Sequence, residues 1–165
     1  MAVAIPRTAR SGDGEWALAE MRAPDLPAII EIEQLSFANP WSSALFLQEM
    51  KLPFSRIVVA RPAADPAETI VGFLCRWFVA DEIHVLNVAV RPDNRRRGIG
   101  GVLVREALRE AREVCATAVT LEVRRDNVEA RRLYERLSFE EVGVRRNYYG
   151  RGEDALIMRL TLSHA

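Results

Sequence analysis

The stretch that decides the fold is "NVAVRPDNRRRGIGGVLVREAL", residues 87–108. An apolar run is followed by four arginines in seven positions, then by three glycines in four positions, and then by a helical pattern. Glycines lack a Cβ atom, so at the start of a helix they let several backbone N–H groups face one anion. Arginine guanidinium groups add full positive charge beside it. The stretch therefore predicts a binding site for a phosphate-bearing ligand at the start of one helix.

The spacing of the glycines excludes two common phosphate-binding motifs. A P-loop requires Gly-Lys-Ser or Gly-Lys-Thr, which this stretch lacks. The dinucleotide-binding fingerprint requires a glycine three positions after Gly100, where Leu103 stands, and it must directly follow its strand. The pattern that remains is Arg-x-x-Gly-x-Gly, from Arg95 to Gly100. A glycine turn beside a solvated arginine surface stays open as an alternative.

Composition limits the classes of partner. A chain of 165 residues with 49% hydrophobic residues fits a single globular domain. Its 23 basic and 23 acidic residues balance, so we expect neither a nucleic-acid nor a membrane partner. Cys75 and Cys115 lack the spacing of metal ligands, and we expect no metal. With no apolar run of membrane-spanning length and no secretory signal, we expect a cytoplasmic protein, and nothing predicts its oligomeric state.

Apolar periodicity predicts a mixed α/β order. Helices are expected over residues 23–37, 39–50 and 127–137 and from residue 102 onward, with Asp25, Ser42 and Asn127 as N-caps. Strands are expected over residues 56–60, 69–80, 82–90, 117–125, 141–149 and 155–162. Residues 1–20 are expected to form a flexible N-terminal tail, followed by one domain over residues 21–165.

Several motifs together resemble one enzyme family. The Arg-x-x-Gly-x-Gly pattern after "NVAV" resembles the pyrophosphate-binding motif of the GNAT superfamily of N-acetyltransferases, whose ligand is acetyl-coenzyme A (acetyl-CoA). "LNVAV", "RRRGIGG", "LEVRRDNVEARRLYERLSF", "RRNYY" and "NPWS" occur in the order and spacing of the ribosomal-protein-alanine N-acetyltransferases, the RimI group. This resemblance covers residues 24–162. It implies a single-domain α/β GNAT fold, with a mixed, mostly antiparallel central sheet flanked by helices.

The resemblance also implies which residues contact acetyl-CoA. The backbone of Val88, Ala89 and Val90 is expected to pair with the pantetheine amides, and the pyrophosphate is expected at Arg95, Arg96, Arg97, Gly98, Ile99, Gly100 and Gly101. Asn127 is expected to cap its helix while contacting the pantetheine arm. Ser138 stands where this family usually has glycine. If that position requires a positive φ, serine costs about 1 kcal/mol there.

Glu122 is the candidate general base. It is the only acid in the apolar run "AVTLEV", and burial there would raise its pKa toward the working range. The strand pattern alone also fits a solvated glutamate paired with Arg124. The resemblance decides for the first interpretation, because Glu122 matches the proton-accepting glutamate of the group.

Tyr134 is the candidate acid, although its helical spacing alone also fits a core residue. In the resembling family the matching tyrosine points at the coenzyme sulfur, so we include Tyr134 among the coenzyme contacts. A phenol (pKa ~10) is a weaker acid than a thiol (pKa ~8.5), so a hydrogen bond that strengthens as charge develops on sulfur describes its role better than full proton transfer. His84 and His164 are the only histidines, and neither forms a recognisable nucleophile motif with serine or cysteine. Direct attack in a ternary complex is therefore favoured.

The resemblance implies that the acceptor is the N-terminal alanine of a small-subunit ribosomal protein. An α-amine with a pKa near ~8 is roughly a tenth neutral at pH 7, whereas a lysine near ~10.4 is almost fully charged. Trp41, Tyr148 and Tyr149 could line the peptide channel, or the two tyrosines could simply finish a strand.

Other functions stay open. The chain could acetylate a lysine, a polyamine or another small amine, or it could be a CoA-binding subunit without turnover. Nucleic-acid binding by the arginine cluster is disfavoured by the net charge of zero. The start "MAVA" adds a hypothesis of its own: removal of Met1 would expose Ala2, which the enzyme could acetylate on itself.

Overall fold

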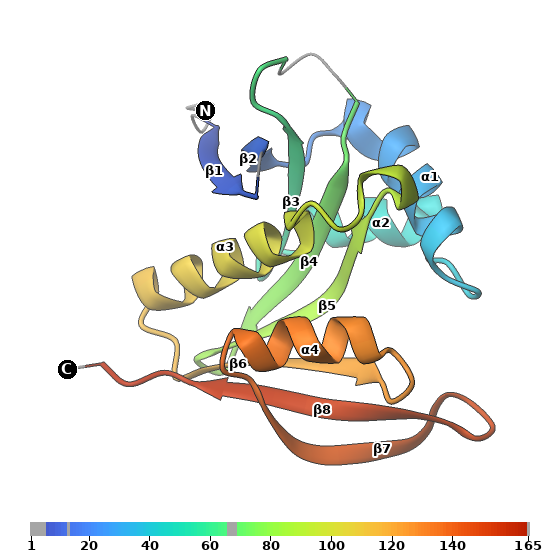
Figure 1. Cartoon of the computed structure of the whole chain (residues 1–165), viewed down its shortest axis with the longest axis vertical. Helices are drawn as coiled ribbons and strands as arrows, with labels where there is room; N and C mark the ends of the chain where they lie inside the picture. The colour runs from blue at the N-terminus through green and yellow to red at the C-terminus, as the bar shows by residue number, and fades with distance from the viewer. Residues whose placement is uncertain (1–5, 13, 66–68, 165) are drawn as a thin grey trace. The chain divides into compact units, whose positions relative to one another are not determined.

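The structure is a computed structural model that describes residues 6–12, 14–65 and 69–164. Within these residues the chain forms eight strands and four α-helices (Figure 1). The strands are β1 Arg7–Ser11, β2 Gly14–Glu20, β3 Ser55–Pro62, β4 Gly72–Val79, β5 Glu82–Val90, β6 Ala118–Arg124, β7 Glu140–Gly150 and β8 Glu153–Thr161. The helices are α1 Leu26–Ser36, α2 Ser43–Lys51, α3 Ile99–Glu113 and α4 Val128–Arg136, with short 3-10 helices at Ala23–Asp25 and Pro92–Asn94.

The sheet is mixed and mostly antiparallel. Its strands are hydrogen-bonded in the order β1-β2-β3-β4-β5-β6-β8-β7. The β1–β2, β2–β3, β3–β4, β6–β8 and β7–β8 pairs are antiparallel, and the β5–β6 pair is parallel. A parallel pair needs a crossover connection, which α3 supplies between β5 and β6. The predicted α/β fold class is confirmed.

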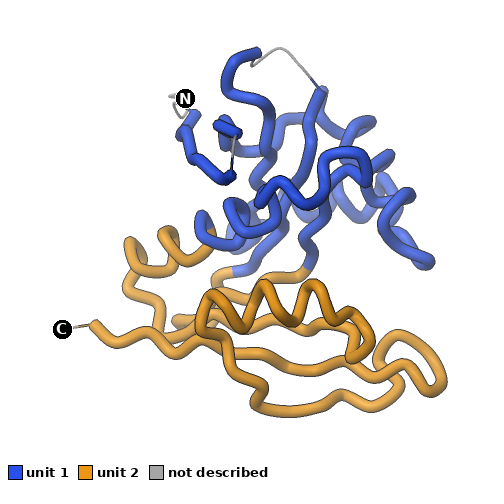
Figure 2. The backbone as a smooth tube through the Cα atoms, viewed as in Figure 1, with its two compact units in different colours: residues 1–77, 87–106 blue, residues 78–86, 107–165 orange. Residues whose placement is uncertain are grey.

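The chain divides into two compact units (Figure 2). Unit 1 comprises residues 1–77 and 87–106, and unit 2 comprises residues 78–86 and 107–165. Strand β5 and helix α3 each contribute residues to both units. The glycine- and arginine-rich stretch lies in unit 1, whereas Glu122 and Tyr134 belong to unit 2.

The core of unit 1 forms where apolar faces of helices and strands meet. The middle of β3, residues 57–60, is fully buried, as are Ile29 and Ile32 on one side of α1. Phe46 of α2 packs edge-on against Phe73 of β4, with ring centroids 5.6 Å apart. Burial of these side chains supplies the main free energy that holds the unit together.

In unit 2, buried and partly exposed side chains alternate along most of β6, as the sequence predicted. Val119, Leu121 and Val123 are buried, and Leu121 is paired with the buried Met158 of β8. Successive side chains of a strand point to opposite faces, so Glu122 lies on the face opposite to this apolar row.

The predicted N-terminal tail is the main difference between expectation and structure. Residues 7–11 and 14–20 form the antiparallel strands β1 and β2, and β2 continues the sheet by pairing with β3. The indole of Trp16 is only 1% exposed, and Leu18 beside it on the strand face is also buried. Burial of these two side chains against the sheet holds the hairpin in place, which the short alternation "EWALAE" did not reveal. Residues 1–5, including Ala2, and residue 13 lie outside the described residues.

Two of the three predicted helix caps are confirmed. The side chain of Ser42 accepts the backbone N–H of Leu45 at 3.2 Å, and that of Asn127 accepts the N–H of Ala130 at 3.1 Å. Asp25 precedes α1 but makes no such bond. Its buried carboxylate instead accepts the backbone N–H of Arg22 at 2.8 Å and the guanidinium of Arg61 at 2.5 Å, and it therefore anchors the helix entry to β3.

The turn after α4 contains Ser138, the serine that stands where the family usually has glycine, and its backbone is left-handed. Ser138 adopts φ = +73°, in the left-handed region. The backbone N–H groups of Ser138 and Phe139 bond back to the last turn of α4, and the side chain of Phe139 is buried. The position thus does require a positive φ, and serine occupies it at a cost in conformational energy.

Candidate active site

The start of α3 forms a backbone arrangement suited to an anion. Arg96 and Gly98 adopt φ values of +64° and +79°, and the helix begins at Ile99. The carbonyl of Gly98 accepts the N–H of Val102 at 3.1 Å, as the first acceptor of the helix. The N–H groups of the first turn, which includes Gly100, have no partner within the helix, and the helix dipole adds partial positive charge there. These residues lie at a helix N-terminus, as the sequence predicted.

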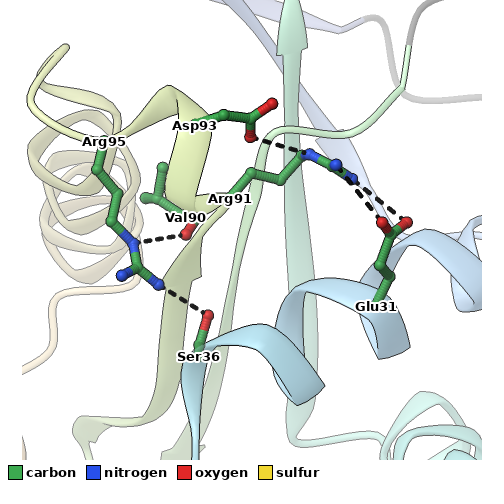
Figure 3. A network of polar contacts seen from close by, with 6 residues as sticks. All are labelled: Glu31, Ser36, Val90, Arg91, Asp93 and Arg95. Atoms are coloured by element: carbon green, nitrogen blue, oxygen red, sulfur yellow. Dashed lines mark hydrogen bonds and ion pairs between the residues drawn. The ribbon is translucent and has the colours of Figure 1, made fainter.

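The arginines beside this turn differ in what they contact (Figure 3). Arg95 donates from Nε to the carbonyl of Val90 at 3.0 Å and from Nη2 to the hydroxyl of Ser36 at 3.2 Å. Arg91, which was not a predicted ligand, is paired with Glu31 at 3.3 Å and with Asp93 at 3.4 Å. Two of the predicted coenzyme contacts, the Arg95 guanidinium and the Val90 carbonyl, are therefore hydrogen-bonded to each other within the chain.

The other residues of this stretch that we expect to contact the coenzyme differ in exposure. Arg96 is exposed, and among the described residues its guanidinium has no hydrogen-bond or ion-pair partner. Arg97 lies over the ring of Trp16, 4.7 Å from its centroid. The side chains of Ile99 and Ala89 are buried, so these two residues can offer a ligand only their backbone. Arg96 is thus the predicted arginine best placed to bind an external anion.

A buried glutamate, Glu33, fixes the backbone at Trp41, the residue of unit 1 that we expect to line the peptide channel. Glu33 of α1 is 1% exposed, and its two oxygens accept the backbone N–H of Trp41 at 2.9 Å and the side-chain N–H of Asn87 at 2.8 Å. Burial raises the pKa of Glu33 above its usual value, although both hydrogen bonds oppose that rise. The half-buried ring of Trp41 packs against Phe46 with ring centroids 5.3 Å apart.

Sequence reasoning missed Glu33 and Asn87. A signal was available for the first: Glu33 stands four positions after Ile29 and next to Ile32, and hence on the buried side of the helix. An acid at such a position needs polar partners, but its partners lie 8 and 54 residues away in the sequence and could not be inferred from it.

In unit 2, Glu122 lies between two basic side chains. Its carboxylate is 10% exposed, with Oε2 at 2.7 Å from Nε2 of His84 on β5 and Oε1 at 3.5 Å from Nη2 of Arg145 on β7. The alternative partner, Arg124, is instead paired with Glu153 at 3.4 Å and lies over the ring of Tyr149 at 4.3 Å. Glu122 is therefore a largely buried, paired carboxylate rather than a solvated one.

The pKa of Glu122 shifts in the direction opposite to the prediction. Burial is the largest single influence and raises it, as expected. The hydrogen bond and charge of His84, together with the charge of Arg145, lower it by more, so the net pKa lies below the usual value for glutamate. The expectation of a raised pKa is wrong because it allowed for burial but not for these two partners. Glu122 is consequently ionised throughout the neutral range.

Tyr134 and Tyr149 keep their phenolic protons. Tyr134 on α4 is 5% exposed, and burial raises its pKa above the usual value for tyrosine. Its ring packs edge-on against Phe139 with centroids 5.8 Å apart. Burial likewise raises the pKa of Tyr149 to about 12, with further contributions from Tyr148 and from the charge of Glu122. Both phenols can donate a hydrogen bond at neutral and mildly alkaline pH.

Tyr149 of β7 lies close enough to Glu122 for the carboxylate charge to act on its phenol. Tyr148 and Tyr149 contact each other edge-on, with ring centroids 5.0 Å apart. Arg145 lies 5.5 Å from the ring centroid of the exposed Tyr148. Unit 2 therefore brings three of the predicted site residues, Glu122, Tyr148 and Tyr149, close to one another and adds His84, which was not predicted as a site residue.

Within the described residues, the structure contains no group of three or more His, Cys, Asp or Glu side chains placed to hold a metal ion. No helix in the same residues is long and apolar enough to cross a lipid bilayer. Both cysteines are free, Cys75 buried in β4 and Cys115 exposed after α3.

Comparison with known proteins shows the family. Residues 26–139 match the model of the acetyltransferase (GNAT) family. The chain is 38% identical over 142 residues to the [ribosomal protein bS18]-alanine N-acetyltransferase of Salmonella typhimurium, covering 84% of this chain and 93% of the relative. It is 31% identical over 161 residues to an N-alpha-acetyltransferase of Sulfurisphaera tokodaii, covering 90% and 94%. The crystal structure of the ribosomal-protein-S18-alanine N-acetyltransferase from Escherichia coli matches with a TM-score of 0.81 and 34% identity, covering 91% of this chain and 96% of that one. The chain belongs to the acetyltransferase (GNAT) family of N-acetyltransferases.

Proposed function

We propose that this chain transfers the acetyl group of acetyl-CoA to the N-terminal α-amine of a protein, with the N-terminal alanine of a small-subunit ribosomal protein as its acceptor. The observation that carries the proposal is the largely buried, ionised Glu122 carboxylate, which lies between His84 and Arg145 at the position that matches the family's proton acceptor. The names of the Salmonella typhimurium and Escherichia coli relatives support alanine as the acceptor residue.

The residues of unit 1 fit the coenzyme. The N–H groups at the start of α3 are suited to its pyrophosphate, as is the exposed guanidinium of Arg96, which has no ion-pair partner in the part of the chain that the structure describes. The backbone of Val88 and Ala89 is proposed to pair with the pantetheine amides, while the carbonyl of Val90 is already engaged by Arg95. Arg97 would first have to leave the ring of Trp16 to reach the phosphates, so we assign it a secondary role.

The acetyl group passes directly to the acceptor. The neutral α-amine attacks the thioester carbonyl, a C–N bond forms, and the C–S bond breaks as coenzyme A leaves. The nitrogen becomes strongly acidic once the C–N bond forms, so Glu122 can accept its proton although the carboxylate pKa is lowered. Tyr134 donates a hydrogen bond to the departing thiolate, which its raised pKa permits across the working range.

The contacts of the two histidines support this route over a covalent acetyl-enzyme. His84 is bonded to Glu122, and Nε2 of His164 lies 2.6 Å from the carbonyl of Ala116. Neither imidazole is thus paired with a serine or cysteine that it could activate as a nucleophile.

Trp41, Tyr148 and Tyr149 are proposed to bind the acceptor peptide. Tyr148 is half exposed and packs edge-on against Tyr149, and the backbone N–H of Trp41 donates to the carboxylate of Glu33. Rigid aromatic side chains provide contact area at low entropic cost.

A panel of acceptors tests the proposal. Release of free coenzyme A is followed with peptides that begin with alanine, serine or methionine, with an N-terminally blocked peptide containing lysine, and with a polyamine. We expect the alanine peptide to give the highest kcat/KM and the blocked peptide to be inactive. Faster turnover of lysine or polyamine would replace the proposal with a small-amine or lysine acetyltransferase, and binding of acetyl-CoA without any turnover would indicate a non-catalytic subunit.

Self-acetylation of Ala2 is tested separately, because that residue lies outside the described residues. The intact mass of purified wild-type protein is compared with that of the Glu122→Gln variant. A lower acetylated fraction in the variant supports self-modification, and an equal fraction excludes it.

A further inference from the structure

The N-terminal hairpin is bonded to the turn that precedes α3. The indole Nε1–H of Trp16 donates to the hydroxyl oxygen of Ser11 at 2.8 Å, and the Ser11 hydroxyl donates to the backbone carbonyl of Arg97 at 2.7 Å. All three residues belong to unit 1. The family match covers residues 26–139, so Ser11 and Trp16 lie outside it. This relay connects a segment outside the matched region to the proposed pyrophosphate-binding turn.

The relay fixes the direction of one peptide group. The carbonyl of Arg97 and the N–H of Gly98 belong to the same peptide unit, and in a trans peptide they point in opposite directions. No peptide bond in the described residues is cis. Because Ser11 holds the carbonyl toward the hairpin, the N–H of Gly98 must face away from the hairpin. Gly98 adopts φ = +79°, and glycine populates positive and negative φ about equally, so an external hydrogen bond can select one orientation of the Arg97–Gly98 peptide.

Two further contacts show that the hairpin lies directly against the turn. A Cβ atom added to Gly98 would lie 2.7 Å from the Cβ of Ser11, so no larger residue fits at this position without displacing β1. The guanidinium of Arg97 lies 4.7 Å from the ring centroid of Trp16, whose indole is buried. Both the backbone and the side chain of Arg97 are therefore held by the hairpin, through Ser11 and Trp16 respectively.

We propose that Ser11, supported by Trp16, is a positioning residue for acetyl-CoA: its hydroxyl orients the Arg97–Gly98 peptide so that the Gly98 N–H is available to the pyrophosphate. The inference rests on the proposed function, because it assumes that the turn binds this group. In this role Ser11 acts through the Arg97–Gly98 peptide rather than by contacting the ligand. Its loss should weaken binding of any ligand that carries the pyrophosphate and leave the acetyl-transfer step unchanged.

The test compares Ser11→Ala with Thr8→Ala, which removes an exposed hydroxyl from the same strand. Turnover of an alanine-starting peptide is measured with acetyl-CoA and with acetyl-pantetheine, which lacks the pyrophosphate. For Ser11→Ala we expect KM for acetyl-CoA, and Kd for coenzyme A by calorimetry, to rise about three- to ten-fold, as for the loss of one hydrogen bond. The kcat with acetyl-CoA and the kcat/KM with acetyl-pantetheine should stay within about two-fold of wild type. Thr8→Ala should match wild type throughout.

A second variant removes the unsatisfied indole N–H, and the melting temperature of each variant is measured beside its affinity for coenzyme A. Ser11→Ala leaves the Trp16 N–H without its acceptor and could lower the melting temperature. The double variant Ser11→Ala/Trp16→Phe has no such N–H, yet it still lacks the bond to Arg97, and we expect it to weaken coenzyme A binding at least as much as the single variant.

Two results would overturn the inference: equal coenzyme A affinity of Ser11→Ala and Thr8→Ala, or an equal loss with acetyl-CoA and acetyl-pantetheine. These are distinct from failure of the proposed function, in which the wild-type chain itself neither binds coenzyme A nor releases it from acetyl-CoA.

Discussion

His84 and Glu122 lie on neighbouring parallel strands, with the imidazole Nε2 2.7 Å from the carboxylate Oε2. The two residues are 38 positions apart in the sequence, and only the β5–β6 pairing brings them together. Arg145 approaches the other carboxylate oxygen from β7. This arrangement keeps Glu122 ionised while most of its side chain is buried, which makes it a preorganised proton acceptor.

Glu122→Gln is expected to lower kcat by about 10²- to 10⁴-fold, because glutamine has nearly the same shape but cannot take the proton of the attacking amine. The KM for acetyl-CoA should change little. Steady-state kinetics with an alanine-starting peptide checks both quantities. Glu129→Gln, which neutralises an exposed acid on α4, is the matched control and should retain wild-type kcat. A Glu122→Gln variant as active as this control would exclude Glu122 as the base.

His84→Ala is expected to raise the pKa of Glu122. Burial, which raises this pKa, remains in the variant, whereas the hydrogen bond and charge of His84, which lower it, are lost. In the wild type, the lowered pKa means that ionised Glu122 stabilises the folded chain above its unfolded-state pKa, and that this contribution disappears as pH falls through the folded-state value. The variant should lose this contribution and begin to lose activity at a higher pH.

Carbon-detected NMR of labelled glutamate side chains, titrated with acid, measures the Glu122 pKa directly. His84→Gln keeps a hydrogen-bond donor without the positive charge and should give an intermediate value. An unchanged or lower pKa in His84→Ala would show that Arg145 alone determines the ionisation of Glu122.

Tyr134→Phe is expected to reduce kcat by about 10²-fold, as for the loss of one hydrogen-bond donor to a developing negative charge. Phenylalanine preserves the ring that packs against Phe139, so the melting temperature and the affinity for coenzyme A should be close to wild type. Because the pKa of Tyr134 is raised, this phenol should not lose its proton in the mildly alkaline range, and it should not cause any alkaline decline of wild-type activity. A variant with full kcat would reduce Tyr134 to a packing residue.

Ser138→Gly is expected to stabilise the chain. Relief of the left-handed strain at φ = +73° is worth about 1 kcal/mol, and the greater freedom of glycine in the unfolded chain offsets about half of it. The free energy of unfolding, measured by urea titration, should therefore rise by about 0.5 kcal/mol. Ser138→Ala keeps the Cβ atom and should bring no gain; a gain of equal size there would show that backbone strain is not the cause.

Features set by local sequence were predictable. The glycine-rich helix start, the Asn127 cap and the alternation that puts Glu122 opposite Leu121 each depend on residues within one or two turns or strands, where periodicity and capping rules apply. The possible positive φ at Ser138 came from the family resemblance, because Ser138 stands at a helix end where the family usually has glycine.

Features that depend on contacts between residues far apart in the sequence could not be predicted. Strands β1 and β2 form the N-terminal hairpin because β2 pairs with β3, some forty residues later in the sequence, and because Trp16 and Leu18 of β2 are buried. The direction of the Glu122 pKa depends on His84 and Arg145, which its own strand does not contain. A sequence pattern reports that a residue is buried, but its electrostatic partners are known only once the strands are placed in order.

The central claim is direct transfer from acetyl-CoA to an N-terminal alanine amine. Tandem mass spectrometry tests it with deuterium-labelled acetyl-CoA and one peptide that carries both an N-terminal alanine and an internal lysine. We expect the label on the α-amine of the peptide. When the enzyme is first incubated with labelled acetyl-CoA alone and then freed of it, we expect no label to pass from the enzyme to peptide added later. Label on the lysine, or a labelled enzyme that passes its acetyl group to peptide added later, would contradict the account.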